Sequence, residues 1–343
     1  MKSKRWTVRF ITIPPLLLGL IFAFNFIIDP YSVTPYNLLK IPNKFARDDR
    51  IEKVSHLSKS EKYDAIILGS SRVYSYNPLQ AEQYLKTSVY NAGVGTALVE
   101  DHLGFLLYLE RINKFPSLVI LGIDFYSFNP EVPTNPYFLR NNDLNFMHKR
   151  TDSTEYLSKF LSTDALRASY KTVLNYLFHP GAKPRFNTYG SKAGTETLFG
   201  FPPLNRQEVL HFSKNKISKE LRFIKTAEYP RIDALRLQYL QHIFELVKKH
   251  HADIILFVTP ISSDLLHEIN TDSVLKTRLE EFKTLLLSYG PYYDFTTDNR
   301  INDDAFYFSN PTHTTAIAGN LVLARILHQN DADLPKDFGV YHT

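Results

Sequence analysis

The sequence predicts an α/β fold, a three-layer sandwich in which helices cover both faces of a central, mainly parallel five-stranded sheet. Two observations lead to this prediction. Short apolar runs recur along the chain and end at small or polar residues, as buried strands do, and amphipathic helical stretches separate them. Because strand and helix alternate, each helix is expected to link two parallel strands and to pack on the sheet. A hydrophobic fraction of 44% over 343 residues supplies the core that this arrangement needs.

The elements follow one another in a regular order that is interrupted once. Strands are expected at 64–69, 88–93, 118–124, 252–260 and 292–296, and helices at 78–85, 96–113, 231–251, 273–290 and 316–329. The interruption, residues 125–226, is rich in Asn, Phe and Tyr and is expected to be a helical insertion. Its aromatic residues, among them Tyr126, Phe128 and Tyr137, fit either stacking on sugar rings or packing against the sheet.

The N-terminus predicts a membrane anchor. Residues 1–9 hold four basic residues and no acid, and residues 10–28 form an uncharged apolar run. About nineteen helical residues nearly cross the hydrocarbon core, and the basic flank predicts a cytoplasmic N-terminus with the rest of the chain outside. A cleaved signal peptide and a buried helix of a soluble domain are the alternatives, although no small-x-small cleavage site follows the run. Residues 29–62 are expected to be a stalk or N-terminal extension, 63–330 the α/β domain and 331–343 a tail.

The charge of the chain argues against a nucleic-acid partner. The formal net charge is +5, but outside the basic flank 36 Lys and Arg residues face 35 acidic ones. The remaining chain is thus nearly neutral and lacks the basic surface that nucleic acids require. The chain contains no cysteine and no zinc-peptidase spacing of histidines, so no metal site and no cofactor is expected.

Three expected strand ends predict a site at one edge of the sheet. Gly69 to Arg72, Asn91 to Gly95 and Gly122 to Asp124 all follow strands, and ligands of parallel sheets bind at the carboxyl ends of strands. Ser71 becomes a nucleophile there if a base takes its proton; otherwise G-S-S is a turn with a local hydroxyl bond. His313 precedes the last helix and would return to the same edge, with Asn310 in reach of its ring.

These residues resemble the four sequence blocks of the SGNH, or GDSL, hydrolase superfamily, over roughly residues 60 to 330. The sequence GSSR stands after the first strand, a glycine after the second, a polar residue after the third and NPTH before the last helix. The resemblance implies a flavodoxin-like strand order, Ser71 as nucleophile and oxyanion donor, Gly93 or Gly95 as second donor and His313 as base. The anchored N-terminus and the phrases LGSSRV and FYFSNPTH are similar to those of envelope members, such as the D-alanine transfer protein of lipoteichoic acid synthesis and the alginate O-acetylation proteins.

Two positions depart from the family pattern. Asn310 stands where the family has the acid of the triad, and an amide orients imidazole without stabilising its cation by charge. Asp303 or Asp304 is the candidate substitute acid. Asp124 stands where the family has an oxyanion-hole asparagine, and an ionised carboxylate would repel the oxyanion. The alternative is that Asp124 pairs with Arg72, which could instead face an anionic substrate group.

Two functions of different classes are consistent with these features. The first is a membrane-anchored, extracytoplasmic serine esterase or O-acyltransferase that acts on envelope glycans or acyl esters through a Ser71 acyl-enzyme. The second is a catalytically impaired binding or scaffolding partner of a membrane-bound O-acyltransferase or polysaccharide assembly. A Ser71 that reacts in a manner dependent on His313 is expected from the first function alone.

Overall fold

The computed structural model describes residues 2–30, 38–39, 41, 49–139, 141–147, 159–179, 186–192, 211–327 and 334–343. The chain divides into two compact units, which are considered separately. The first comprises residues 1–56 and 146–185, and the second comprises residues 57–145 and 186–343. Parts of the expected stalk and of the expected insertion lie outside the described residues.

The second unit contains the predicted sandwich, and its sheet follows the order β2-β1-β3-β4-β5-β8. The first five strands in chain order are parallel: β1 (Ala65–Leu68), β2 (Val89–Asn91), β3 (Leu118–Ile123), β4 (Asp253–Val258) and β5 (Tyr292–Asp294). The order of these five strands is the flavodoxin-like one. The fold class is therefore confirmed.

The sheet has a sixth strand, which the sequence did not predict. The strand β8 (Val340–His342) pairs antiparallel with β5, from Asp294↔Val340 to Tyr292↔His342. Aromatic neighbours strengthen the pairing: the ring centroids of Tyr293 and Tyr341 lie 4.7 Å apart. The strands β2 and β5 are equally short but belong to apolar stretches that the sequence shows, whereas Val340–His342 belongs to none, so residues 331–343 were expected to be a tail.

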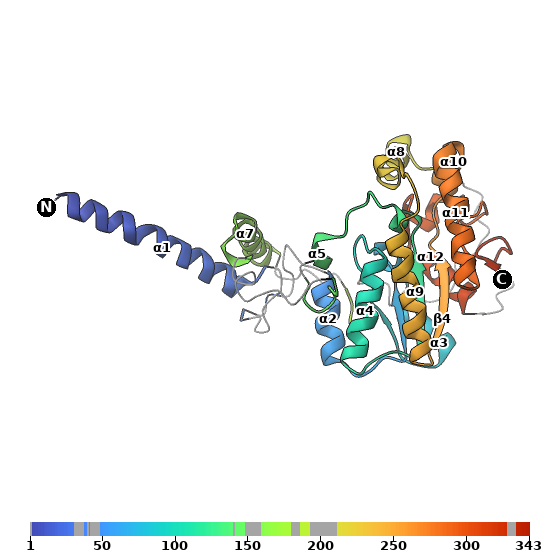
Figure 1. The fold of residues 1–343 in the computed structure, drawn as a ribbon, viewed down its shortest axis with the longest axis horizontal. Coiled ribbons are helices and arrows are strands. Elements are labelled where there is room, and N and C mark those ends of the chain that lie inside the picture. Colours follow the sequence, from blue (N-terminus) through green and yellow to red (C-terminus); the bar gives the residue numbers. More distant parts are fainter. Residues whose placement is uncertain are drawn as a thin grey trace. The chain divides into compact units, whose positions relative to one another are not determined.

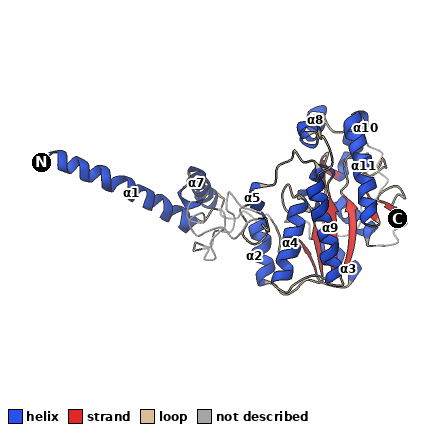
Figure 2. Ribbon diagram, in the orientation of Figure 1, coloured by secondary structure: helices blue, strands red, loops and turns tan. Residues whose placement is uncertain are grey.

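Helices cover both faces of the sheet because the strands are apolar on both sides. On one face, α3 (Pro78–Leu85) packs with α12 (Ala316–Ile326) over side chains such as Ile67 and Ile120. The intervening residues of the strands point to the other face. There α4 (Val99–Arg111) and α9 (Ala234–Lys249) lie side by side, in front of the strands in Figures 1 and 2.

Further elements complete the unit. The helices α2 (Asp49–Lys59, shared with the first unit), α5 (Pro136–Leu139), α8 (Lys214–Ile224), α10 (Ser263–Thr271) and α11 (Ser273–Tyr289) accompany a short hairpin of β6 (Phe308–Asn310) and β7 (His313–Thr314). Single 3-10 turns are η1 (Ser71–Val73), η2 (Phe125–Phe128), η5 (Thr226–Glu228) and η6 (Ala305–Tyr307).

The first unit is built on the helix α1 (Lys2–Ile28), of which Phe10–Ile28 is long and apolar enough to cross a membrane. Its C-terminal part packs on η3 (Lys159–Leu161) and α7 (Thr163–Phe178). Asn25 Nδ2 donates to the carbonyl oxygen of Phe160 at 2.7 Å, and the Phe160 ring contacts Phe22 and Phe26 edge-on. The apolar run expected to be a membrane span, residues 10–28, forms the C-terminal two thirds of α1.

Candidate active site

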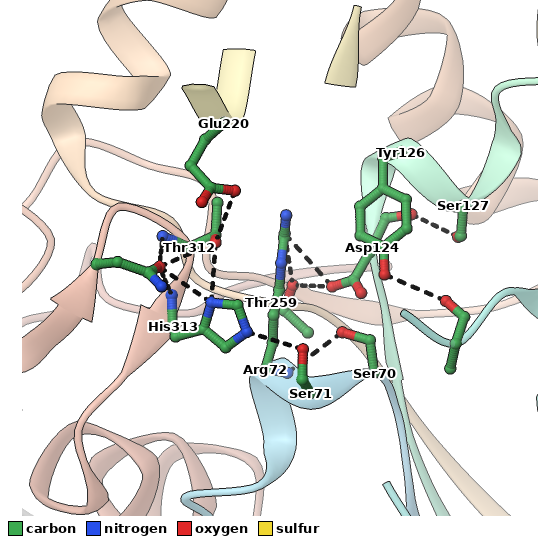
Figure 3. A network of polar contacts seen from close by, with 12 residues as sticks. Ser70, Ser71, Arg72, Asp124, Tyr126, Ser127, Glu220, Thr259, Thr312 and His313 are labelled. Atoms are coloured by element: carbon green, nitrogen blue, oxygen red, sulfur yellow. Dashed lines mark hydrogen bonds and ion pairs between the residues drawn. The ribbon is translucent and has the colours of Figure 1, made fainter. Parts of the chain in front are cut away.

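The candidate site lies at the carboxyl ends of β1, β3 and β4, where the β6-β7 hairpin returns to the sheet (Figure 3). Ser71 begins the turn η1 directly after β1, and His313 begins β7. The Ser71 Oγ and the His313 Nε2 are 2.8 Å apart, within hydrogen-bond distance. The two residues are separated by 242 positions in sequence, so the fold alone brings them together.

Local hydrogen bonds hold Ser71 in the turn. Ser70 caps η1 with extended backbone, and its hydroxyl accepts from the backbone N–H of Arg72 at 3.2 Å. The carbonyl oxygens of Ser70 and Ser71 accept from the N–H groups of Val73 and Tyr74, at 3.1 and 3.2 Å. A small hydroxyl residue before the nucleophile thus serves as the cap of the turn that presents it.

Val73 fixes the same turn against three strand-end glycines. A Cβ atom added at Gly93 would lie 2.5 Å from Val73 Cγ2, and one at Gly69 would lie 2.6 Å from Val73 Cγ1. At Gly122 the added Cβ would lie 2.6 Å from the Phe257 ring and 3.1 Å from Val73 Cγ1. Val73 is fully buried, so it fills the space that side chains at these positions would need. The glycines that marked the strand ends in the sequence are therefore explained by close packing.

The ring of His313 is oriented by Asn310. The Oδ1 atom of Asn310 lies 3.0 Å from His313 Nδ1 and also accepts from the backbone N–H groups of Thr312 and His313, each at 3.0 Å. An amide oxygen is an acceptor, so Nδ1 carries the proton and Nε2 presents its lone pair to the Ser71 hydroxyl. This is the tautomer that a general base requires.

Burial keeps this imidazole neutral. Desolvation, reinforced by the positive charge of Arg72, lowers the pKa of His313 to about 4; Lys192 acts in the same direction and Asp124 opposes it. The ring is therefore unprotonated at neutral pH and free to accept a proton. The same environment disfavours the imidazolium that forms when Ser71 gives up its proton.

Asp124 and Arg72 form a buried pair next to the serine. Their closest atoms, Arg72 Nη1 and Asp124 Oδ1, are 3.4 Å apart, and their side chains are 7% and 2% exposed. Thr259, at the end of β4, links them: its hydroxyl donates to Asp124 and accepts from Arg72 Nη1 at 3.2 Å. The guanidinium also lies over the ring of Tyr126, 5.2 Å from its centroid. The structure thus pairs Asp124 with Arg72, as the alternative expectation for Asp124 had it.

The predicted second oxyanion donor is engaged elsewhere. The Gly93 N–H donates to Asn91 Oδ1 at 2.9 Å, and the Asn91 amide in turn donates to the carbonyl oxygens of Val73 and Tyr76. The carbonyl oxygen of Gly95 accepts from Asn135 Nδ2 at 3.3 Å. The loop after β2 is therefore tied to η1 and to the segment before α5.

Neither candidate substitute acid contacts the His313 ring. Asp304 instead caps η6, accepting from the Phe306 N–H at 2.8 Å, and Asp303 is exposed.

Of the aromatic residues predicted either to stack on sugar rings or to pack against the sheet, some are buried and some are exposed. Tyr126 and Phe128 are buried, whereas Tyr137 is 43% exposed.

Sequence reasoning missed three residues of this site: Thr259, Thr312 and Glu220. Thr259 follows a predicted strand and could have been found as a fourth polar strand end. Thr312 adjoins His313, and its hydroxyl lies 3.1 Å from His313 Nδ1. Glu220 comes from α8 at the end of the insertion, and no sequence pattern connects it to the histidine. Among the described residues, no group of His, Asp and Glu side chains is arranged to hold a metal ion.

Comparison with known proteins assigns no family to this chain. No protein-family profile matches this sequence, and no curated protein sequence does so. One solved structure that this chain resembles is "The structure of a putative platelet activating factor from Streptococcus pneumonia", with 12% sequence identity and a TM-score of 0.37. The alignment covers 81% of this chain and 91% of that one.

Proposed function

We propose that this protein is a membrane-anchored serine esterase or O-acyltransferase of the SGNH type, with Ser71 as nucleophile and His313 as base. The observation that carries the proposal is the contact of 2.8 Å between Ser71 Oγ and His313 Nε2, with the opposite ring nitrogen held by Asn310. A serine needs such a base, and the base needs such an orienting group. The order of the motifs along the chain and the flavodoxin-like sheet support the same assignment.

The reaction follows from the positions of these groups. The Ser71 proton moves to His313 Nε2 while Oγ attacks the carbonyl carbon of an ester, forming a tetrahedral oxyanion. The oxyanion collapses, the bond to the leaving oxygen breaks, and that oxygen takes the proton from Nε2. The Ser71 acyl-enzyme then passes its acyl group to water or to an acceptor hydroxyl by the same steps in reverse order.

Oxyanion stabilisation is assigned to the turn that carries Ser71 and to the loop after β2. The backbone N–H of Ser71 is one donor, and the loop after β2, with Gly93 and Gly95, is proposed to supply the second. The buried guanidinium of Arg72 adds positive charge beside the reacting oxygen, moderated by Asp124. Preorganised charge of this kind acts strongly in a desolvated site.

The substrate class follows from the anchor. With Phe10–Ile28 in the membrane and a basic flank before it, the catalytic unit is proposed to lie outside the cytoplasm. Ester-bearing envelope glycans and acyl esters are the substrates within reach there. A membrane-bound O-acyltransferase is the proposed partner if the protein transfers acyl groups to glycans.

The test is labelling of the full chain, purified in detergent, with a fluorophosphonate probe that reacts with activated serines. The parent is expected to be labelled, Ser71→Ala not at all, and His313→Gln at least a hundredfold more slowly. Ser288→Ala, at an exposed position near the C-terminal end of α11, is the matched control and should react like the parent. A folded parent that is not labelled would overturn the enzyme proposal in favour of the binding or scaffolding function. Incubation of a labelling-competent protein with p-nitrophenyl acetate, with and without an oligosaccharide acceptor, separates hydrolysis from transfer.

A further inference from the structure

Among the described residues, no carboxylate contacts the ring of His313 directly. Its Nδ1 lies 3.0 Å from Asn310 Oδ1 and 3.1 Å from Thr312 Oγ1, and both of these groups are neutral. The charges of Arg72 and Lys192 disfavour the protonated ring, and the charge of Asp124 favours it. A reaction that makes an imidazolium here therefore needs negative charge from another source.

The Thr312 hydroxyl connects the ring to such a charge. Thr312 Oγ1 donates to Glu220 Oε2 at 3.2 Å, a contact visible in Figure 3. Its alternative acceptor, Asn310 Oδ1 at 3.1 Å, already receives two backbone N–H groups. A carboxylate is the stronger acceptor, so the hydroxyl proton points to Glu220 and the oxygen lone pairs face His313 Nδ1–H.

His313 Nδ1–H is shared between Asn310 Oδ1 and Thr312 Oγ1, and the branch through Thr312 runs in one direction, from Nδ1–H to Oγ1–H to the Glu220 carboxylate. Thr312 is 1% exposed, so its hydroxyl is shielded from water, and hydrogen bonds in such chains polarise one another. The Glu220 oxygen lies at most about 6 Å from the ring nitrogen, since two bonds of 3.2 and 3.1 Å separate them. A unit charge at that separation acts appreciably on the imidazolium.

We propose that Glu220 supplies the negative charge missing from Asn310 and acts on His313 through the Thr312 hydroxyl, as a positioning and charge-stabilising residue. This inference rests on the proposed function of Ser71 and His313. No proton leaves Nδ1 and no covalent bond changes in the relay; the carboxylate stabilises the imidazolium while Nε2 holds the serine proton. Because Glu220 belongs to α8, the end of the insertion completes the site.

The decisive experiment measures the rate of fluorophosphonate labelling in variants of the full chain. Glu220→Gln and Thr312→Val are each expected to react about tenfold more slowly, because Glu220 is half-exposed and acts through one hydroxyl. Thr312→Ser keeps the hydroxyl and should stay within twofold of the parent. Glu228→Gln, on the adjacent turn η5 and 74% exposed in its side chain, is the matched control.

Two combinations test the relay as a unit. The double variant Glu220→Gln/Thr312→Val should be no slower than either single variant, because both remove the same interaction. In an Asn310→Asp background, which places a carboxylate directly on Nδ1, adding Glu220→Gln should change the rate less than twofold. The inference would be overturned if Glu220→Gln were labelled within twofold of the parent rate. It would also be overturned if Glu220→Gln still slowed labelling tenfold in the Asn310→Asp background.

A measurement independent of activity separates this inference from the proposed function. Proton NMR of the His313 Nδ1–H, assigned with His313→Gln, should show an upfield shift in Glu220→Gln as the hydrogen bond weakens, and none in Glu228→Gln. If the parent is not labelled but this shift appears, the relay exists in a protein that is not a serine enzyme. Identical Nδ1–H signals in parent and Glu220→Gln would refute the relay whatever the labelling shows.

Discussion

Replacing Asp124 with Asn is expected to destabilise the fold strongly. The amide keeps the shape of the carboxylate and can still accept from Thr259, but it removes the negative charge that faces Arg72. Both side chains of the pair are at least nine-tenths buried, so the guanidinium would remain desolvated without a countercharge. Breaking a buried ion pair in this way costs about 3 to 5 kcal/mol of unfolding free energy.

The cost is large enough to measure by thermal unfolding. A loss of about 3 to 5 kcal/mol lowers the unfolding temperature by roughly 6 to 20 °C in a unit of this size. Circular dichroism of the full chain in detergent would follow the transition. Asp303→Asn is the matched control, because Asp303 is exposed and its replacement should change stability by less than about 0.5 kcal/mol.

A second variant tests the cause. Arg72→Met removes the cation as well, so the double variant Arg72→Met/Asp124→Asn should recover part of the stability that Asp124→Asn loses. If Asp124→Asn unfolds within about 2 °C of the parent, the pair contributes no such energy. If the loss of unfolding free energy in the double variant equals the sum of the two single losses, the unpaired charge of Arg72 is not the cause of the loss in Asp124→Asn.

Three further outcomes follow from the site. Because burial lowers the pKa of His313 to about 4, labelling of Ser71 should be constant from pH 5.5 to 8 and fall to half its rate near pH 4; half-loss near pH 6.5 would contradict this. In the unfolded chain His313 takes up a proton below about pH 6.5, whereas in the folded protein it does so only near pH 4. The free energy of unfolding of the parent should therefore fall by about 3 kcal/mol more between pH 7 and pH 4 than that of His313→Gln, as urea unfolding would measure. Gly93→Ala should lower the free energy of unfolding by about 1 to 3 kcal/mol, because its Cβ would lie 2.5 Å from Val73. The double variant Gly93→Ala/Val73→Ala should lose less than the sum of the two single losses, and strict additivity would refute the clash.

The sequence was sufficient for the sheet and its main helices because their signals are long. The strand β3 lies within a run of apolar residues, and the helix α11 ends one residue short of its expected bounds at 273–290. The strands β7 and β8 lie in no apolar stretch of the sequence and owe their structure to the partner strand. The helix α10 was missed because it follows β4 closely and is only nine residues long.

The site was predictable where residues follow strands and unpredictable where the insertion returns. Ser71 and His313 were expected at one edge of the sheet because parallel strands end together, and the structure brings them to 2.8 Å. The contact of Glu220 with Thr312 spans 92 positions and depends on how α8 packs, which no local pattern encodes. The hydrogen bond from the Gly93 N–H to Asn91 was equally hidden, because it depends on one side-chain rotamer.

The packing of Val73 against Gly69, Gly93 and Gly122 has a consequence for how this chain can vary during evolution. A larger residue at Gly69 or Gly93 has room only if the residue at 73 becomes smaller, since the added Cβ would meet the Val73 methyl groups; at Gly122 it would first meet the Phe257 ring. Related chains should therefore change the sizes of the residues at positions 69, 73 and 93 together and not one at a time. A sequence search that requires glycine at positions 69 and 93 would miss relatives in which a smaller residue at 73 makes room for a larger one there.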